Sequence, residues 1–301
     1  MNFVFFGTPE PAVEILDALF AKGFVPALVV TAPDKPQGRK LLVTPPPVKV
    51  WALAHGIPFI QPSSLTDPEV LRQLSKVNGQ LFIVVAYGSL IPKEILALPK
   101  HGSLNVHYSL LPKYRGASPI EFQILNDDRD AGISILLLDE EMDHGPIVAE
   151  KSIPHSLFPI PDWPPTATEL RKISNQVAGE LLADILPDWI SGKIQAKPQD
   201  HRKATYTRKF KKTDGELDLS GDLYPDEVER QRRAYKNLLK IKAFEGSIGT
   251  YFFVEKSEKK MRVSIKDAKM EGDKLVITRV VPEGKKEMSY EEFVRGLVKR
   301  D

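Results

Sequence analysis

Cysteine is absent from this 301-residue chain. Without thiols the protein has no disulfide, no thiolate zinc site and no cysteine nucleophile. The six histidines are scattered along the chain and lack the spacing of a metal cluster. We therefore expect no metal, and we expect any catalysis to depend on oxygen and nitrogen groups.

Long apolar runs are also missing. No run of the roughly 18 apolar residues needed to span a membrane occurs, and the stretch MNFVFFGTPE has no basic region before its apolar residues. We therefore predict a soluble, cytoplasmic protein without a signal peptide or a membrane partner, and we expect a monomer. The stretch FFGTPE holds a single glycine and lacks the others of a dinucleotide-binding fingerprint, so we expect no nicotinamide site.

The charge of the chain is unevenly distributed. The net charge is +2, but residues 201–301 hold 25 Lys and Arg against 18 Asp and Glu, a balance of +7, which leaves −5 for residues 1–200. This polarity suggests that the second part meets a polyanion, with a solvated basic face as the plain alternative.

Short apolar runs alternate with helical patterns through the first part of the chain, as in a βαβ fold. The pairs are residues 2–6 with 11–23, 25–32 with 47–56, and 81–88 with 92–99. Strands that are apolar on both sides indicate a parallel sheet covered on both faces. We therefore predict an α/β fold with a Rossmann-like, doubly wound, mostly parallel sheet, whose ligands bind at the carboxyl ends of the strands.

The rest of the chain predicts a second, smaller domain. Residues 131–140 and 145–153 are expected to be strands, and residues 168–191 a long helix interrupted or ended near Pro187. A polar, basic stretch then resembles an exposed linker, and the last runs predict a helix and a small antiparallel sheet or barrel, OB-like in kind. We expect residues 1–200 to form the catalytic domain and residues 201–301 to form the linker and a basic β-rich domain.

One short strand carries two polar side chains. In SLNVH, residues 103–107, strand alternation places Asn105 and His107 on the same side near the carboxyl end of the strand. The later loop EMDHG carries Asp143. A strand-end Asn and His satisfied by backbone groups is the ordinary alternative to a catalytic pair.

The residues around this pair resemble a known family. The stretches NVHYSLLPKYRGASPI and MDHGPI are similar to the signature N-x-H-x-S-L-L-P-x-x-R-G and the later aspartate-glycine turn of the formyltetrahydrofolate-dependent formyltransferases. The stretches FFGTPEPAVEIL, PDKPQGRKLLVTPPPVK and VVAYGSLIP follow the family order and resemble the branch that formylates methionyl-tRNA, rather than the sugar or purine formyltransferases. Roughly the last third of the chain matches only loosely.

The resemblance implies a reaction, substrates and a site. It implies transfer of the formyl group of 10-formyltetrahydrofolate to the α-amino group of initiator methionyl-tRNA for translation initiation, and a catalytic set of Asn105, His107 and Asp143. It further implies folate contacts by Ser109, Leu110, Leu111, Pro112, Val85, Tyr87 and Gly88, and tRNA contacts by Lys35, Arg39 and Lys40.

The chemistry of these side chains agrees with formyl transfer. An imidazole titrates close enough to an α-amino group, whose pKa is about 7.7 to 8.0, to accept its proton near neutrality. An amide can donate to the oxyanion of a tetrahedral intermediate, and a carboxylate can orient the imidazole. The rival interpretations are an N-formyltransferase of a nucleotide-linked amino sugar, which needs no polyanion-binding domain, and a non-catalytic RNA-binding module, which gives no reason for the three polar residues.

Three positions depart from the family pattern. Pro11 stands where an aromatic residue is usual, His144 stands where a small residue is common, and FEGSIG replaces a tryptophan-bearing turn. We expect His144 to influence the protonation equilibria beside Asp143.

Overall fold

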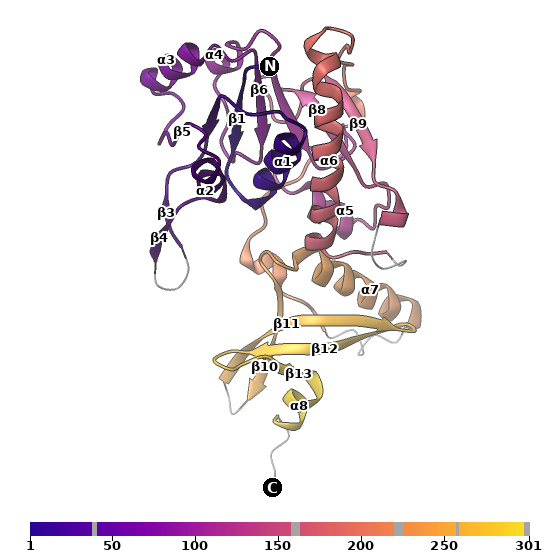
Figure 1. Cartoon of the computed structure of the whole chain (residues 1–301). Coiled ribbons are helices and arrows are strands. Elements are labelled where there is room, and N and C mark those ends of the chain that lie inside the picture. Colours follow the sequence, from indigo (N-terminus) through magenta and orange to yellow (C-terminus); the bar gives the residue numbers. More distant parts are fainter. Residues whose placement is uncertain (38–40, 158–162, 220–225, 257–258, 298–301) are drawn as a thin grey trace. The chain divides into compact units, whose positions relative to one another are not determined.

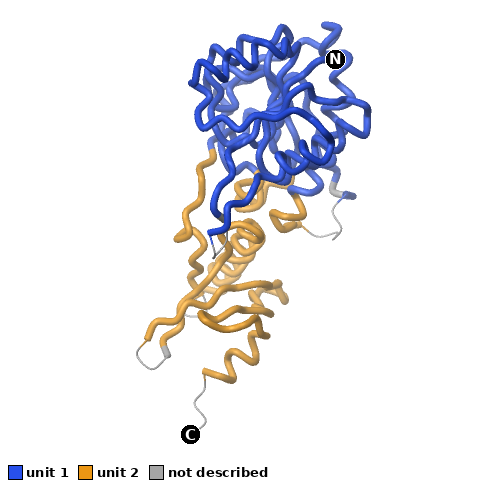
Figure 2. Tube along the Cα trace, turned by 60° about the vertical axis from the view of Figure 1, so that its left-hand side comes forward, with its two compact units in different colours: residues 1–119, 130–157, 171–206 blue, residues 120–129, 158–170, 207–301 orange. Residues whose placement is uncertain are grey.

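The computed structural model describes residues 1–37, 41–157, 163–219, 226–256 and 259–297 (Figure 1). The chain divides into two compact units (Figure 2). Unit 1 contains residues 1–119, 130–157 and 171–206, and unit 2 contains residues 120–129, 158–170 and 207–301. The chain therefore passes between the units more than once, whereas a single boundary was expected from the sequence. The division of roles at residue 200 stays a prediction.

Helices and strands alternate through the amino-terminal part of the chain (Figure 1). The helices are α1 (Glu10–Ala21), α2 (Pro47–Ala54), α3 (Pro68–Val77), α4 (Lys93–Leu96), α5 (Pro119–Leu125), α6 (Ala167–Ile190), α7 (Glu227–Phe244) and α8 (Tyr290–Arg295). The strands are β1 (Phe3–Gly7), β2 (Leu28–Val30), β3 (Lys35–Gln37), β4 (Leu42–Thr44), β5 (Phe59–Ile60), β6 (Leu81–Val85), β7 (Ser103–His107), β8 (Gly132–Leu137), β9 (Ile147–Ser152), β10 (Thr250–Lys256), β11 (Lys259–Glu271), β12 (Lys274–Pro282) and β13 (Met288–Ser289). Short 3₁₀ helices cover His155–Leu157, His201–Lys203 and Lys212–Gly215.

The main sheet of unit 1 has seven strands in the order β5-β2-β1-β6-β7-β8-β9. The first five of these are parallel, and β8 and β9 add antiparallel pairs at one edge. β1 and β6 lie at the centre and are buried along their whole lengths. Helices therefore must cover both faces, as the uniformly apolar runs predict.

The two faces of the sheet are covered by different helices. Phe6 faces a buried cluster that includes Leu74 of α3 and Ile95 of α4. Phe5 points the opposite way because side chains alternate along a strand. A Cβ added to Gly7 would meet Phe5 and Ala12 of α1, so α1 lies on the Phe5 face. The doubly wound α/β class predicted from the sequence is confirmed.

Unit 2 contains an antiparallel sheet in the order β10-β11-β12-β13. Its core includes Phe252, Val263, Ile265 and Val280 from the strands and Ile241 from α7. The pairing of β11 with β12 shifts register between Ile265 and Ala268, which is the signature of a bulge. The predicted β-rich carboxyl-terminal part is confirmed.

Two expectations from the sequence differ from the structure. α6 matches the helix expected over residues 168–191 and ends at Ile190, three residues after Pro187, but the proline does not interrupt it. The polar stretch after α6 is not simply an exposed linker, because Gln199 is buried and Thr205 hydrogen-bonds Pro112 and Tyr114 of unit 1. Within the described ranges, no helix combines the length and apolarity that crossing a membrane requires.

Candidate active site

The site lies at the carboxyl end of β7. Leu104 and Val106 are buried in the sheet, and alternation places Asn105 and His107 together on the other side. β7 pairs with β6 on one side and with β8 on the other, so both polar side chains are carried by a strand inside the sheet. A rigid element therefore sets their relative position.

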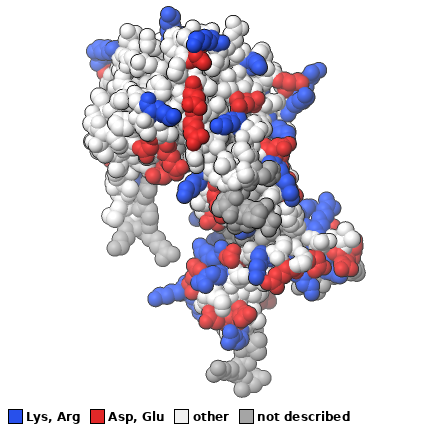
Figure 3. Space-filling model, turned by 45° about the vertical axis from the view of Figure 1, so that its right-hand side comes forward, with Lys and Arg blue, Asp and Glu red and all other residues white. Residues whose placement is uncertain are grey.

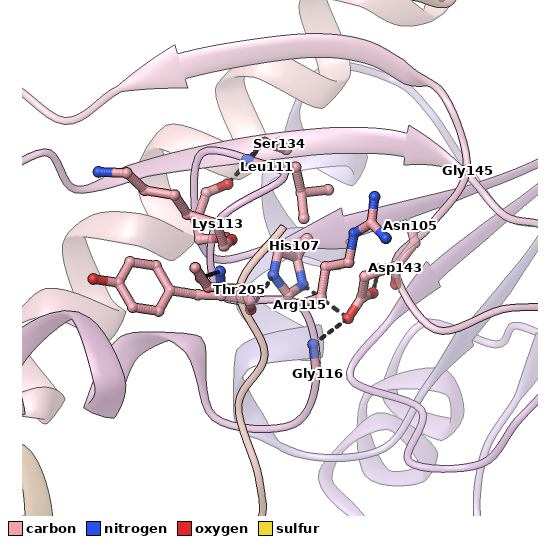
Figure 4. A network of polar contacts seen from close by, with 12 residues as sticks. Asn105, His107, Leu111, Lys113, Arg115, Gly116, Ser134, Asp143, Gly145 and Thr205 are labelled. Atoms are coloured by element: carbon pink, nitrogen blue, oxygen red, sulfur yellow. Dashed lines mark hydrogen bonds and ion pairs between the residues drawn. The ribbon is translucent and has the colours of Figure 1, made fainter. Parts of the chain in front are cut away.

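Asp143 joins the pair from the loop between β8 and β9. One carboxylate oxygen lies 3.4 Å from Asn105 Nδ2, and the other lies 3.5 Å from His107 Nδ1. Gly116 N–H donates to the same carboxylate at 2.7 Å. Figure 4 shows these groups around the carboxylate. The structure thus brings together all three side chains that the sequence predicts as catalytic, although Asn105 and Asp143 are 38 residues apart.

Both ring nitrogens of His107 face oxygen atoms. Nε2 lies 3.0 Å from the carbonyl oxygen of Tyr114, which can only accept a hydrogen bond, and Nδ1 faces Asp143. Each ring nitrogen therefore faces a group that can accept a hydrogen bond. The Nδ1 contact at 3.5 Å is longer than a normal hydrogen bond, so this nitrogen is the better candidate for a reacting proton.

Three non-glycine residues near the site have left-handed backbone. They are Ala86 after β6 (φ 47°), Tyr114 (φ 61°) and Asp143 (φ 51°). Such conformations cost on the order of 1–3 kcal/mol each and persist where the surrounding structure fixes them. The hydrogen bonds at the Tyr114 carbonyl and at the Asp143 carboxylate are two of the contacts that hold this backbone.

The segment after β7 that is predicted to contact folate is held by hydrogen bonds to Ser134 of β8. The Ser134 hydroxyl donates to the carbonyl oxygen of Ser109 at 2.8 Å and accepts from Leu111 N–H at 2.9 Å. Ser109 is itself fully buried and donates to the carbonyl of Lys113 at 2.6 Å. Leu110 and Pro112 are partly exposed. The segment is therefore a fixed turn beside His107.

The other predicted folate segment follows β6. Val85 is buried, and Tyr87 is buried with its ring edge-on to Phe6 at 5.6 Å between centroids. Burial raises the pKa of the Tyr87 phenol, so this group stays protonated. Gly88 is exposed, and a Cβ built on it would meet no atom within 4 Å. Of these three positions, Gly88 leaves the most open backbone.

An open groove lies between α4 and the loop after β8. Its volume is about 550 Å³, and its lining residues are Lys93, Leu96, Ala97, Leu138, Asp139, Glu140 and Glu141. Lys93 and Glu140 form an ion pair across it at 2.5 Å. None of Asn105, His107 and Asp143 lines this groove.

The predicted tRNA-contacting loop is only partly described. Lys35 is exposed in β3, which pairs with β4, while Arg39 and Lys40 lie outside the described residues. The base of this hairpin is fixed by Asp34, which accepts from Gln61 at 2.7 Å and from Lys49 at 2.7 and 2.9 Å. These contacts, the Gln61 amide first, lower the pKa of Asp34, so its carboxyl is ionised at neutral pH.

His144 contacts two groups that the sequence did not connect with it. Its Nδ1 lies 2.7 Å from an Asp139 carboxylate oxygen, and its ring stacks on His201 with centroids 4.1 Å apart and planes at 10°. The influence of His144 on protonation at Asp143 stays a prediction. Pro11 lies in the first turn of α1, a position that proline tolerates.

Sequence reasoning missed Gln199, which hydrogen-bonds the backbone of the loop that carries Asp143. Gln199 donates to the carbonyl oxygens of Asp143 and Gly145 and accepts from Arg115. Arg115 belongs to the SLLPKYRG stretch, but Gln199 lies in a polar segment without any periodic signal. The link between Gln199 and the site becomes visible only from its hydrogen bonds to residues that are distant in the sequence.

The comparisons with known proteins agree with this geometry. The sequence model of the family described as Formyl transferase matches residues 1–156. A protein of Chloroflexus aurantiacus named methionyl-tRNA formyltransferase is 42% identical over 237 residues, covering 78% of this chain and 73% of its own length. A protein of the same name from Thermodesulfovibrio yellowstonii is 35% identical over 307 residues, covering 98% of this chain and 96% of its own.

A solved structure shares the fold at low identity. The sugar N-formyltransferase of Shewanella sp FDAARGOS_354 superposes with a TM-score of 0.59 at 17% identity, covering 86% of this chain and 95% of that one. The chain belongs to the formyl transferase family, and within it to the methionyl-tRNA formyltransferases.

Proposed function

We propose that this protein transfers the formyl group of 10-formyltetrahydrofolate to the α-amino group of initiator methionyl-tRNA, the step that prepares this tRNA for translation initiation. Relatives that are 35–42% identical carry that name. The observation that carries the proposal is the convergence of an amide, an imidazole and a backbone N–H on the Asp143 carboxylate at the carboxyl end of β7. Ligands of such sheets bind at this edge.

The proposed reaction is an acyl transfer. The amine nitrogen of the methionyl group attacks the formyl carbon, a C–N bond forms, and the carbonyl oxygen becomes an oxyanion. His107 takes the proton that the amine loses, and Asn105 donates an N–H to the oxyanion. When the intermediate collapses, the bond to folate N10 breaks and the proton passes to that nitrogen.

Asp143 has a positioning role in this proposal. Its carboxylate faces His107 Nδ1 and therefore stabilises the imidazolium formed after proton removal. The same carboxylate holds the Asn105 amide, so one group sets both the proton acceptor and the oxyanion donor. Because its second oxygen accepts from Gly116 N–H, the carboxylate is itself fixed.

Folate binding is proposed for the two segments beside the site. Ser109, Leu110, Leu111 and Pro112 follow β7 directly, and their turn is held by Ser134. Val85 ends β6, the neighbouring strand, and Tyr87 and Gly88 follow it. Because the side chains of Val85 and Tyr87 are buried, we expect this second segment to act through its backbone and through the open position at Gly88.

For tRNA binding we propose Lys35, Arg39 and Lys40 together with the basic residues of the carboxyl-terminal part. Lys35 is exposed on a hairpin whose base is held by Asp34. Phosphate contacts of this kind give affinity without sequence information. We expect the protein to act as a monomer in the cytoplasm.

An acceptor comparison tests the function. Purified protein is incubated with 10-formyltetrahydrofolate and either methionyl-tRNA or a nucleotide-linked amino sugar, and the formylated product is measured by mass spectrometry. We expect formylmethionyl-tRNA, with a His107→Ala variant as the inactive control. Faster formylation of the amino sugar would move the assignment to a sugar N-formyltransferase, and RNA binding without any transfer would favour a non-catalytic module.

A further inference from the structure

A buried glutamine supports the loop that carries Asp143. Gln199 is 6% exposed and comes from the segment after α6. Its side-chain amide donates to the carbonyl oxygen of Asp143 at 2.9 Å and to that of Gly145 at 2.7 Å. A single NH₂ group has two hydrogens, so both donors of Gln199 are used on this loop.

The acceptor end of the same side chain is occupied by an arginine. Arg115 is 2% exposed, and its guanidinium donates to Gln199 Oε1 from Nε at 3.1 Å and from Nη2 at 2.6 Å. Arg115 Nη2 also lies 2.8 Å from His201 Nδ1. Because arginine only donates, His201 must accept through Nδ1 and hold any ring proton on Nε2. Arg115 thus has two neutral acceptors from one short segment, residues 199–201.

The carboxylate and the backbone carbonyl of Asp143 each accept hydrogen bonds from residues linked to Arg115. Gly116 N–H holds the carboxylate, and Gly116 follows Arg115 directly in the chain. Gln199 holds the carbonyl, and Arg115 holds Gln199. Asp143 has a left-handed backbone, which costs less for aspartate than for most other non-glycine residues. This closed set of contacts fixes both the backbone and the carboxylate of Asp143.

We propose that Gln199 is a positioning residue for the transfer reaction, acting on Asp143 through the loop backbone and thereby on Asn105 and His107. The inference rests on the proposed function for the roles of Asn105, His107 and Asp143 and for the choice of acceptor in the assay. The side-chain hydrogen bonds of Gln199 go to Asp143, Gly145 and Arg115, whereas Asn105 and His107 contact the Asp143 carboxylate. The effect of Gln199 on the two catalytic side chains therefore passes through Asp143.

Two substitutions separate the two ends of the glutamine. Gln199→Met keeps much of the shape and removes both donors and the acceptor. Gln199→Glu keeps an acceptor for Arg115 but replaces the NH₂ group by a carboxylate oxygen, which loses both hydrogen bonds to the loop and repels the two carbonyl oxygens. We expect both variants to lower kcat by at least about tenfold and by up to about a hundredfold, the loss that a misplacement of about 1 Å can cause. The KM values for folate and acceptor should change by less than about threefold.

A double-mutant cycle with Asp143→Asn separates positioning from general destabilisation. If Gln199 acts through Asp143, adding Gln199→Met to Asp143→Asn should lower kcat by less than about threefold further, because the group being positioned is already impaired. A residue that merely supports the fold would lower kcat by the same factor in both backgrounds.

Gln176 supplies the matched control. It is an exposed glutamine on α6 whose side chain donates to Glu180 at 3.3 Å. Gln176→Met and Gln176→Glu should leave kcat unchanged. All variants are compared by circular dichroism and thermal denaturation before kinetics are measured.

Defined results would overturn the proposal. They are wild-type kcat in a folded Gln199→Glu variant, independent effects of Gln199 and Asp143 in the cycle, or loss of the fold in both Gln199 variants. The proposed function has its own readout, since the wild-type protein is assayed with both acceptors first. If the wild type formylates only the amino sugar, the same kcat ratios are measured with that acceptor.

Discussion

Adding one methyl group to Gly145 should damage catalysis through the backbone. A Cβ at this position would lie 1.9 Å from the carbonyl oxygen of Leu137, whereas real Cβ contacts stay above 3.0 Å. The two groups must therefore separate by about 1 Å, by these distances. Leu137 N–H also donates to the carbonyl of Pro146 at 2.9 Å, so the strand end and the loop are tied together and cannot part freely.

The loop that must move carries Asp143 two residues earlier. A misplacement of about 1 Å can lower a rate by about a hundredfold, which corresponds to about 2.7 kcal/mol of activation free energy. We expect Gly145→Ala to lower kcat by roughly that factor, while overpacking lowers the free energy of unfolding by about 1–3 kcal/mol. The assay measures kcat and both KM values together with thermal denaturation.

Gly192→Ala is the control that lowers stability without moving the loop that carries Asp143. Gly192 has φ 76° and no atom within 4 Å of an added Cβ, so the substitution strains only its own backbone, at about 1–2 kcal/mol. We expect a comparable loss of stability with unchanged kcat. A folded Gly145→Ala protein with kcat within about threefold of the wild type would refute the reasoning that the loop backbone positions Asp143.

Three further predictions concern the proton acceptor, the tRNA loop and a helix cap. Asn105→Ala and His107→Ala should each lower kcat by about a hundredfold or more with the fold intact by circular dichroism, and near wild-type turnover in either would contradict its role. Lys35→Glu should weaken methionyl-tRNA binding and reduce the slope of log affinity against log salt by about 0.9 for each phosphate that is no longer neutralised. Lys76→Glu on α3 is the control and should change neither quantity. Equal effects of the two substitutions in titrations at several salt concentrations would count against a role of the loop in tRNA binding. Asp67→Ala removes the 2.9 Å cap of α3 and should lower stability by about 1 kcal/mol in denaturation experiments without changing turnover, so an unchanged midpoint would contradict it.

The sheet and the polar trio could be predicted because their signals are local. The apolar runs of β1 and β6 exceed what a half-exposed strand requires, which indicates burial on both faces. Period-two alternation along β7 is enough to bring Asn105 and His107 together. Asp143 needed the family resemblance, since nothing in its own loop gives the distance to β7.

Helix α3 also had local signals, although the prediction passed over it. Asp67 accepts from Glu69 N–H as the amino-terminal cap, and Pro68 occupies the first turn. Asn78 ends the helix in the left-handed conformation. A search for caps as well as for apolar periodicity would therefore have found this helix.

Gln199 had no such signal. Its partners lie 54, 56 and 84 residues earlier in the chain, at Gly145, Asp143 and Arg115. The surrounding residues are polar and basic, so composition predicts exposure, whereas Gln199 is buried. A buried amide is stable there because all its donors and acceptors are used, and this property depends on tertiary structure.

The charge balance of the carboxyl-terminal part also has to be separated from the arrangement of its charges, because some of its cations are paired with carboxylates. Arg208 pairs with Asp214 at 2.7 Å, and Arg233 pairs with Glu229 at 2.8 Å. On the face shown in Figure 3, Lys and Arg are interspersed with Asp and Glu rather than gathered into one unbroken patch. A paired cation must exchange its carboxylate for a phosphate before it contributes to RNA binding, so the +7 balance does not count phosphate contacts. The slope of tRNA affinity against salt counts them directly, because it depends on the counterions released.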